Sequence, residues 1–584
     1  MSYKWVYSTS PGKESVLNLQ EELNVPEIIA YLLGLRKIDN YQKAKSFFRP
    51  DTSLLYNPFL MQDMEAGACR LSTAIRNHER VVIYGDYDVD GTTGVSILYL
   101  FLKQFGLDVY YYIPHRFKEG YGINADGIRY AIQKDASLIV SVDCGITAID
   151  EAKFAKQHGI DLIICDHHTV GEEIPDAVAV LNPKRQDCDY PFKGLSGAGV
   201  GFKLLQAVLQ KLGLPSDIAY SYLDLVAISI ASDIVPIVDE NRVMMRKGLK
   251  LINSEPRTGI RALLSRTGLE PGTVSTNHIV FSLGPRINAA GRMGDATTAV
   301  ELMISETPEE AAHYAGKLES INKLRKDTDQ LTTNQALEML ENDYDLESTS
   351  AMVLHHPEWH LGVIGIVASR LVDAHYRPTI MLSTVDGKVK GSARSIKGFN
   401  IYEALKQCED LLEQFGGHEF AAGLTMSYQN LEEFRKRINE IARSTFIDSD
   451  FKPELEITAT LNLNDINPRF WKLLSQFEPF GPGNARPVFV SRDICVEGKP
   501  AIVGNGHLKM KVRQEDSPVF DVIGFNMHPY EPLLRDCQRR SVDIAYVLEE
   551  NHWNCRRSIQ IRLKDIHVNW ERGSCDNSDA TSLN

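Results

Sequence analysis

The sequence predicts a multidomain α/β protein with a parallel sheet, a second α/β domain and a small β-barrel. Between residues 80 and 236, short apolar runs alternate with helical segments, which is the pattern of βαβ units around a parallel sheet. A second stretch of this kind begins near residue 351, and from residue 454 onward short strands alternate polar and apolar residues. The chain has 584 residues, which is too long for one core and suggests about three or four domains.

We expect six regions along the chain. They are a helical extension over 1–75, the parallel-sheet domain over 76–240, a helical region with a long connecting helix over 241–345, the second α/β domain over 346–450, an oligonucleotide-binding (OB-like) barrel over 451–570 and a disordered tail over 571–584. The connecting helix begins with a hydroxyl cap, proline and acids at Thr307–Glu310 and has one candidate break near 327–329.

Composition narrows the class of protein. With 43% hydrophobic and 24% charged residues, the chain is typical of soluble globular proteins. It lacks an apolar run long enough for a membrane span and a signal-peptide core, and its nine cysteines form no CxxC pair. We therefore expect a cytoplasmic protein without a membrane partner or a disulfide framework. The net charge of -14 does not exclude nucleic acid, because binding depends on a local basic groove.

Four of the predicted strands end in acidic or histidine residues. The strands and the residues that follow them are Val81–Tyr84 with Asp86, Asp88 and Asp90; Leu138–Val142 with Asp143; Asp161–Cys165 with Asp166, His167 and His168; and Val226–Ile230 with Asp233. Because the carboxyl ends of parallel strands meet at one edge of a sheet, we expect these side chains to converge there. Only divalent cations make so much negative charge tolerable, so this convergence predicts a metal site.

Each cluster also has a simpler interpretation when it is taken alone. The first three acids could form a solvated turn, Asp143 could cap a helix, the histidines could be core or turn residues, and Asp233 could form a turn. Their joint occurrence at one edge favours metal binding. Carboxylate and imidazole ligands suit Mn²⁺ or Mg²⁺, and two such ions bridged by Asp143 would suit phosphoryl chemistry.

The motifs around these residues resemble those of the DHH phosphoesterase superfamily. The matching stretches are Tyr84–Gly91 (YGDYDVDG), Gly120–Ile123 (GYGI), Val142–Gly145 (VDCG), Asp166–His168 (DHH), Leu181–Pro183 (LNP), Ala231–Pro236 (ASDIVP) and Pro285–Arg292 (PRINAAGR). The resemblance covers nearly the whole chain and points to the branch of single-strand-specific 5′→3′ exonucleases.

The resemblance implies a role for each residue of the acidic edge. The implied metal ligands are Asp86, Asp88, Asp90, Asp143, His167 and Asp233. His168 would approach the scissile phosphate and act with Asp143 in catalysis, whereas Asp166 would orient the neighbouring histidine. The implied cofactors are two Mn²⁺ or Mg²⁺ ions.

Two stretches of the second α/β domain combine serine, arginine and glycine amides, which can form a phosphate cradle. Gly391–Ser395 (GSARS) and Phe415–His418 (FGGH), together with Trp359–Arg370, resemble the DHHA1 domain that accompanies the DHH domain. The residues that would then contact the DNA backbone or its 5′ phosphate are Ser392, Arg394, Gly416, Gly417 and His418, with Arg286 and Arg292 opposite them. Alternatively, Arg292 could pair with a nearby carboxylate.

The terminal barrel offers weaker signals. Phe477–Asn484 resembles the element that leads into the OB fold of the same exonuclease branch. Lys509, Lys511 and Arg513 alternate along one predicted strand and could follow a phosphate backbone, while Phe520 and Phe525 could stack on bases. Aromatic residues in the barrel core and lysines that solvate an edge strand explain the same pattern equally well.

The resemblance implies an exonuclease that degrades single-stranded DNA from the 5′ end, releases 5′-mononucleotides and acts in DNA repair and recombination. It suggests single-strand-binding protein and a RecQ-type helicase as partners, and we expect a monomer. There are two alternatives. The first is another enzyme of the superfamily, a nanoRNase or cyclic-dinucleotide phosphodiesterase, which would lack the N-terminal extension and the terminal β domain. The second is a non-catalytic scaffold related to replicative helicases. This chain retains the acids that such a scaffold has lost.

Overall fold

The computed structural model describes residues 3–568 except 347, 447–450, 536–540 and 554–555. The chain divides into two compact units, one of residues 51–451 and one of residues 1–50 with 452–584. Each helix of the described residues is too short or too polar to cross a membrane. The predicted tail over 571–584 lies outside the described residues.

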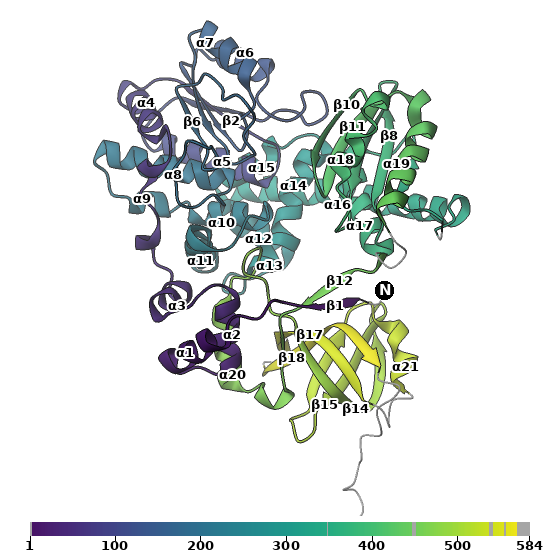
Figure 1. Cartoon of the computed structure of the whole chain (residues 1–584). Helices are drawn as coiled ribbons and strands as arrows, with labels where there is room; N and C mark the ends of the chain where they lie inside the picture. Colours follow the sequence, from purple (N-terminus) through teal and green to yellow (C-terminus); the bar gives the residue numbers. More distant parts are fainter. Residues whose placement is uncertain (1–2, 347, 447–450, 536–540, 554–555, 569–584) are drawn as a thin grey trace, which may run out of the picture. The chain divides into compact units, whose positions relative to one another are not determined.

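The first sheet of residues 51–451, in which Figure 1 labels β2 and β6, has five parallel strands in the order β3-β2-β4-β5-β6. In chain order the strands are β2 (Val81–Gly85), β3 (Val109–Tyr112), β4 (Leu138–Val142), β5 (Asp161–Cys165) and β6 (Ala179–Leu181). The predicted parallel sheet is confirmed. From β2 the chain turns to one side to form β3 and then crosses to the other side to form β4. The switch point, where open α/β sheets bind ligands, therefore lies between the carboxyl ends of β2 and β4.

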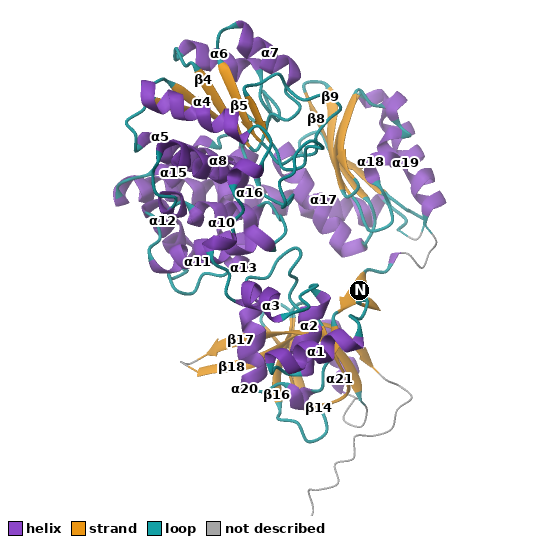
Figure 2. Ribbon diagram, turned by 60° about the vertical axis from the view of Figure 1, so that its left-hand side comes forward, coloured by secondary structure: helices purple, strands orange, loops and turns teal. Residues whose placement is uncertain are grey.

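Helices cover both faces of this sheet (Figure 2). One face carries α4 (Met64–Asn77), α5 (Val89–Lys103) and α8 (Gly197–Leu212). The other face carries α6 (Ala125–Gln133) and α7 (Ile149–Gln157). Two short turns, η1 (Thr52–Leu54) and η2 (Pro58–Leu60), precede α4 in the chain. Successive residues of β2 enter opposite cores: Val81 and Ile83 pack on the first face, Val82 and Tyr84 on the second. Because both faces are buried, the strands appear in the sequence as continuous apolar runs.

A helical layer follows the sheet. It contains α9 (Asp217–Tyr220), α10 (Leu223–Ser232), α11 (Asp239–Ser254), α12 (Thr258–Thr267), α13 (Thr276–His278), η3 (Ile279–Leu283), α14 (Gly284–Met293) and α15 (Thr297–Ile304). The prediction of a strand over Val226–Ile230 is wrong, because this run is the middle of α10. Every residue of α10 from Leu223 to Ala231 is buried, and a short run that is apolar on all sides does not distinguish a buried strand from a buried helix.

The connecting helix α16 (Pro308–Asp343) is unbroken. Its predicted start is confirmed as a capping box in which Glu310 N donates to Thr307 Oγ1 at 3.2 Å. The expected break near 327–329 is absent, since the carboxylate of Asp329 is buried against Arg325 of the same helix and Arg370 of the next one. The polar residues at 327–329 therefore do not end the helix, because Asp329 is part of a packed ionic contact.

The second α/β domain has a five-stranded mixed sheet in the order β10-β11-β9-β8-β7. Its elements are β7 (Met352–His355), α17 (Leu361–His375), β8 (Thr379–Val385), β9 (Lys388–Arg394), α18 (Ile401–Lys406), η4 (Glu409–Leu411), β10 (Gln414–His418), β11 (Ala421–Met426), η5 (Tyr428–Asn430) and α19 (Leu431–Thr445). Helices α16 and α17 pack on one face of the sheet, and α18 and α19 pack on the other (Figure 2).

The other unit contains a closed five-stranded barrel, as the sequence predicts. Strands β14 (Phe489–Val503), β15 (His507–Arg513), β16 (Phe520–Gly524), β18 (Arg556–Val568) and β17 (Val542–Trp553) pair in that order, and β17 returns to β14. The remaining elements are β1 (Lys4–Tyr7), α1 (Lys13–Leu23), α2 (Glu27–Leu35), α3 (Tyr41–Phe48), β12 (Glu454–Ile457), β13 (Ala459–Thr460), η7 (Leu463–Asp465), α20 (Pro468–Leu474), η8 (Ser475–Phe477), η9 (His528–Tyr530) and α21 (Glu531–Arg535).

The N-terminal segment is not wholly helical. Its strand β1 pairs in parallel with β12, about 450 residues further along the chain, with Lys4 opposite Glu454. Trp5 of β1 stacks on His567 of the barrel, with ring centroids 3.8 Å apart. Cys495 in β14 is disulfide-bonded, whereas the cysteines described in residues 51–451 are free thiols.

Candidate metal centre and adjoining cleft

Asp86, Asp88 and Asp90 lie in the turn that joins β2 to α5. Asp88 caps the helix, since its Oδ1 accepts a hydrogen bond from Gly91 N at 3.1 Å. Asp90 belongs to the first turn of α5, so the three acids extend from the end of the strand into the helix. Gly91 has no room for a side chain, because a Cβ there would lie 2.4 Å from the backbone oxygen of Asp86. The packing of this turn therefore fixes the directions of its acids.

The start of α8 holds the carboxylate of Asp90. Gly197 N donates to Oδ2 at 2.6 Å, and Ala198 N donates to Oδ1 at 2.8 Å. The hydroxyl of Ser229 in α10 donates to the same Oδ1 at 2.7 Å. Burial raises the pKa of Asp90 above its ordinary value, and the nearby His167 opposes that rise. Three donors, two of them at the N-terminus of α8, thus hold this acid in one orientation.

Asp143 directly follows β4 and lies at the switch point. Its backbone is left-handed, with φ of 63°, and its N–H donates to Cys165 O of β5 at 2.9 Å. Helix α8 approaches so closely that a Cβ on Gly197 would lie 2.6 Å from the Cβ of Asp143. Asp143 is only 2% exposed. The backbone and the neighbouring helix together direct its side chain toward the other acids.

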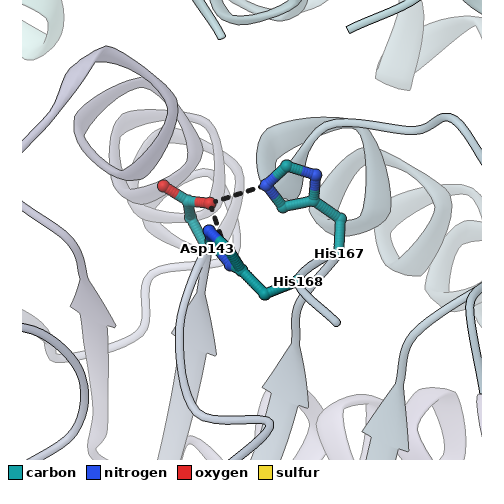
Figure 3. A group of neighbouring side chains, drawn as sticks. All are labelled: Asp143, His167 and His168. Carbon is teal, nitrogen blue, oxygen red and sulfur yellow. Dashed lines mark hydrogen bonds and ion pairs between the residues drawn. The ribbon is translucent and has the colours of Figure 1, made fainter. Parts of the chain in front are cut away.

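His167 lies among three of the acids. Its Nε2 is 3.1 Å from Asp143 Oδ1 (Figure 3). The same nitrogen is 3.5 Å from Asp233 Oδ2 and 3.7 Å from Asp90 Oδ2. Burial lowers the pKa of His167, which favours the neutral ring that can bind a metal. Asp233 thus reaches this centre from the end of α10, although the sequence places it after a strand.

Asp166 orients His168. Its Oδ1 lies 2.7 Å from His168 Nδ1 and also accepts the backbone N–H groups of His167 and His168 at 2.7 and 3.1 Å. Its Oδ2 accepts from Ile146 N at 2.9 Å. Although burial acts to raise the pKa of Asp166, the hydrogen bond to His168 holds it below its ordinary value. The same bond raises the pKa of His168 against the effect of burial. Both oxygens of Asp166 are therefore occupied by the protein.

The acids and histidines form three overlapping groups, in each of which the candidate ligand atoms lie within 4.8 Å of one another. The groups are Asp86, Asp88 and Asp143; Asp90, His167 and Asp233; and Asp143, His167 and His168. Because Asp143 and His167 are shared, the groups are adjacent. Their oxygen and imidazole donors fit two neighbouring Mn²⁺ or Mg²⁺ ions.

The electrostatics of the acids support this assignment. Burial raises the pKa values of Asp86, Asp143 and Asp233, the last to about 9, and neighbouring carboxylates raise them further. Asp86 Oδ1 and Asp233 Oδ2 are buried and accept no hydrogen bond from any described residue. Buried carboxylate oxygens without a donor are what divalent cations bind, and a cation would offset the repulsion among these acids.

A cleft of about 550 Å³ adjoins the acidic turn. Tyr87, which lies between two of the acids, forms part of its wall, and three guanidinium groups line it, those of Arg116, Arg292 and Arg394. Within the described part of the chain, none of the three forms an ion pair with a carboxylate. Burial lowers the pKa of Arg292 to about 10, and the charges of the other two arginines add to this effect. Three cations without a counter-charge form a binding site for an anion.

The opposite wall of the cleft brings together most of the predicted phosphate-binding residues. Ser392, Arg394, Gly416 and Gly417 all line it, and Arg394 Nη1 donates to Ser392 Oγ at 2.9 Å. A Cβ on Gly365 of α17 would lie 2.9 Å from both of these polar groups. The absence of a side chain at this position therefore keeps the serine and arginine open to the cleft.

Arg286 and His418 do not line this cleft. Arg286 Nε lies 2.5 Å from Glu319 Oε2 of α16, and His418 lies exposed at the end of β10. Arg292, in contrast, donates to the backbone oxygen of Gly362 at 3.4 Å. The ion pair considered as an alternative for Arg292 is thus found at Arg286.

Two residues that the sequence did not single out belong to this region. Arg116 lies over the ring of Tyr87, with its Cζ 4.8 Å from the ring centroid. Tyr121 Oη lies 3.0 Å from His168 Nδ1. Both belong to the loop between β3 and α6. Tyr121 stands in the GYGI stretch and could have been found there, whereas Arg116 lies in no motif.

In the barrel, the side chains of Lys509 and Lys511 are exposed on β15, and Arg513 pairs with Glu497 at 2.8 Å. Phe520 is buried, which matches the interpretation of a core aromatic residue. Phe525 is 47% exposed, with Arg562 Cζ 4.9 Å from its ring centroid, so of the two phenylalanines only this one is accessible to a base.

Three family models match the chain. The DHH family, N-terminal domain, matches residues 80–230, the DHHA1 domain matches residues 348–444, and the RecJ OB domain matches residues 457–565. The single-stranded-DNA-specific exonuclease RecJ of Bacillus subtilis (strain 168) is 39% identical over 96% of this chain and 70% of its own length. That of Salmonella typhimurium is 34% identical over 85% of this chain and 89% of its own length.

Solved structures agree with these matches. The crystal structure of RecJ from Thermus thermophilus in complex with Mn²⁺ superposes with a TM-score of 0.82 at 29% identity, covering 97% of this chain and 79% of that one. The same protein in complex with Mg²⁺ gives a TM-score of 0.76 at 27% identity, over 96% and 78% of the two chains. These two crystal structures contain Mn²⁺ and Mg²⁺, the ions that fit the three groups of acids and histidines in this chain.

Proposed function

The chain belongs to the RecJ family of single-stranded-DNA-specific exonucleases, and on that premise we propose that it degrades single strands from the 5′ end and releases 5′-mononucleotides. It is a metal-dependent exonuclease that uses Mn²⁺ or Mg²⁺. We further propose a cytoplasmic monomer that acts in DNA repair and recombination with single-strand-binding protein and a RecQ-type helicase. Family membership supports these wider roles.

The position of the three-arginine cleft carries the proposal of 5′ polarity. Tyr87 is part of the cleft wall and lies between Asp86 and Asp88 of the acidic turn. A terminal phosphate carries more negative charge than an internal one, so it gains most from Arg116, Arg292 and Arg394. A 5′ phosphate bound there would leave the first internucleotide phosphate facing the acids.

Within this proposal, Asp86, Asp88, Asp90, Asp143, His167 and Asp233 hold the ions. Bound ions would lower the pKa of a water nucleophile and stabilise the leaving oxygen. Asp143, which belongs to two of the ligand groups, would connect the two sites. His168 would donate a hydrogen bond to the scissile phosphate, in the orientation set by Asp166.

The test uses one oligonucleotide labelled at the 5′ end or at the 3′ end, with Mn²⁺. We expect the 5′ label to appear at once as a mononucleotide, while the 3′ label stays on a shortening ladder. A duplex of the same sequence should resist. Early release of the 3′ label would overturn the polarity, and dinucleotides preferred over long strands would favour the alternative of a nanoRNase.

The matched variants are Arg394→Ala, in the cleft, and Arg437→Ala, in the same domain but paired with Asp410 at 2.5 Å. The first should raise KM for a 5′-phosphorylated strand about tenfold or more, because a charge-assisted hydrogen bond contributes about 1.5–3 kcal/mol. The second should leave KM unchanged. Equal effects of the two changes would show that the cleft does not bind the 5′ end.

A further inference from the structure

The loop between β3 and α6 contacts three parts of the site. Arg116 covers the ring of Tyr87 in the cleft. Phe117 packs edge-on against His360, which caps α17, with ring centroids 5.5 Å apart. Tyr121 reaches His168 beside the acidic groups. One loop thus connects the phosphate cleft, the second α/β domain and the histidine expected to face the scissile phosphate.

Tyr121 contacts two residues of the metal centre at once. Its hydroxyl donates to the backbone oxygen of Asp143 at 3.1 Å. It also lies 3.0 Å from Nδ1 and 3.4 Å from Nε2 of His168, and the two rings are nearly perpendicular. A phenol has one proton and can also accept, so a hydroxyl that donates to Asp143 presents its lone pairs to the imidazole.

Asp166 and Tyr121 both contact the His168 ring. Asp166 Oδ1 engages Nδ1 at 2.7 Å, and the phenol oxygen contacts the ring edge that carries both nitrogens. Two contacts restrict the rotation of the ring more than one does. Because Tyr121 also holds the backbone of Asp143, which has a left-handed conformation, it connects the two residues expected to act on the phosphate.

Side-chain hydrogen bonds hold the base of the loop, and two glycines shape its tip. Glu119 accepts from His115 N at 2.9 Å and from Tyr112 Oη at 2.6 Å, which fixes the loop base. Gly120 and Gly122 flank Tyr121 with φ of 86° and 92°, and a Cβ on either would meet no neighbour. The glycines are therefore required by the backbone conformation and not by close packing.

We propose that Tyr121 is a positioning residue for His168, and that its loop couples occupancy of the phosphate cleft by the strand's 5′ phosphate to the orientation of that histidine. This inference rests on the proposed function, in which His168 contacts the scissile phosphate and Arg116 helps to anchor the 5′ end. It assigns Tyr121 no contact with the reacting atoms.

The first experiment is a double-mutant cycle in the full chain with Mn²⁺ and single-stranded DNA. Tyr121→Phe keeps the ring and removes only the hydroxyl. We expect kcat to fall about tenfold with KM unchanged, as for the loss of one or two hydrogen bonds. In a His168→Ala background the same change should have a clearly smaller effect, because the contact with that ring is already lost and only the hydrogen bond to Asp143 O remains.

The outcomes separate the inference from the proposed function. An unchanged kcat in His168→Ala would overturn the proposed role of His168 itself. Two results would overturn the inference alone. In the first, His168→Ala loses most of kcat but Tyr121→Phe loses none. In the second, the losses in kcat of the two changes are fully additive in the double variant. Tyr130→Phe on α6, whose ring packs on Tyr112 at 5.2 Å, is the control and should retain kcat.

The second experiment compares strands with a 5′ phosphate and with a 5′ hydroxyl. In the wild type the phosphate should lower KM and also raise kcat. In Tyr121→Phe the 5′ phosphate should still lower KM, but at least half of its effect on kcat should be lost. In Arg116→Ala the 5′ phosphate should change neither KM nor kcat. A full effect of the phosphate on kcat in Tyr121→Phe would overturn the coupling through the loop.

Discussion

Replacing Asp233 by asparagine should stabilise the metal-free protein while it weakens metal binding. Burial, together with Asp90 and Asp88, raises the pKa of Asp233 to about 9. The unfolded chain ionises this carboxyl near pH 4, so folding takes up a proton between about pH 4 and 9, and this contribution to stability falls as the pH rises. At about 1.4 kcal/mol per pH unit, the cost reaches up to about 4 kcal/mol at pH 7. Asparagine has no charge, so we expect a gain of about 2–4 kcal/mol.

The assay is thermal unfolding with EDTA and with Mn²⁺ between pH 5 and 8. With EDTA, Asp233→Asn should melt several degrees above the wild type at pH 7–8, and the difference should shrink toward pH 5. With Mn²⁺, the wild type should gain more stability than the variant, because ligands that bind the folded state stabilise it. Asp150→Asn, at a side chain 90% exposed, is the control. A variant less stable than the wild type with EDTA at pH 8 would refute this reasoning.

Three further changes test other parts of the account. Asp143→Ala should abolish hydrolysis in a nuclease assay, and activity within about tenfold of the wild type would contradict its position between the two ion sites. Gly91→Ala should lower Mn²⁺ affinity in a calorimetric titration, because the new Cβ would displace the backbone of Asp86; an unchanged affinity would contradict this. Lys203→Met leaves Glu240 buried without its partner at 2.7 Å and should cost about 3–5 kcal/mol in urea unfolding, which Lys203→Met with Glu240→Gln should partly restore. A loss below about 1 kcal/mol would contradict that pairing.

Where the sequence carried a periodic or positional signal, it predicted the structure well. The strands before Asp86, Asp143 and Asp166 are buried on both faces, so they stand out as apolar runs that end in acids. The same signal failed before Asp233, because α10 is a helix buried on all sides. The acid nevertheless reaches the centre, since a helix can end at this sheet edge as readily as a strand.

Long-range pairing explains the other differences. Arg286 and Arg292 belong to one motif, but only Arg286 meets a carboxylate, and that partner comes from α16. Strand β1 has four residues and pairs with a segment about 450 residues away, so no local pattern could reveal it. Arg116 reaches the cleft only because its loop folds over Tyr87. Each of these contacts depends on the tertiary fold.

The most direct test of the metal centre is anomalous diffraction from crystals of this protein grown with Mn²⁺. We expect two peaks, one among Asp86, Asp88 and Asp143 and one among Asp90, His167 and Asp233, and the loss of both in Asp143→Ala, because that residue would connect the two sites. A single peak, or peaks away from these side chains, would contradict the two-ion assignment.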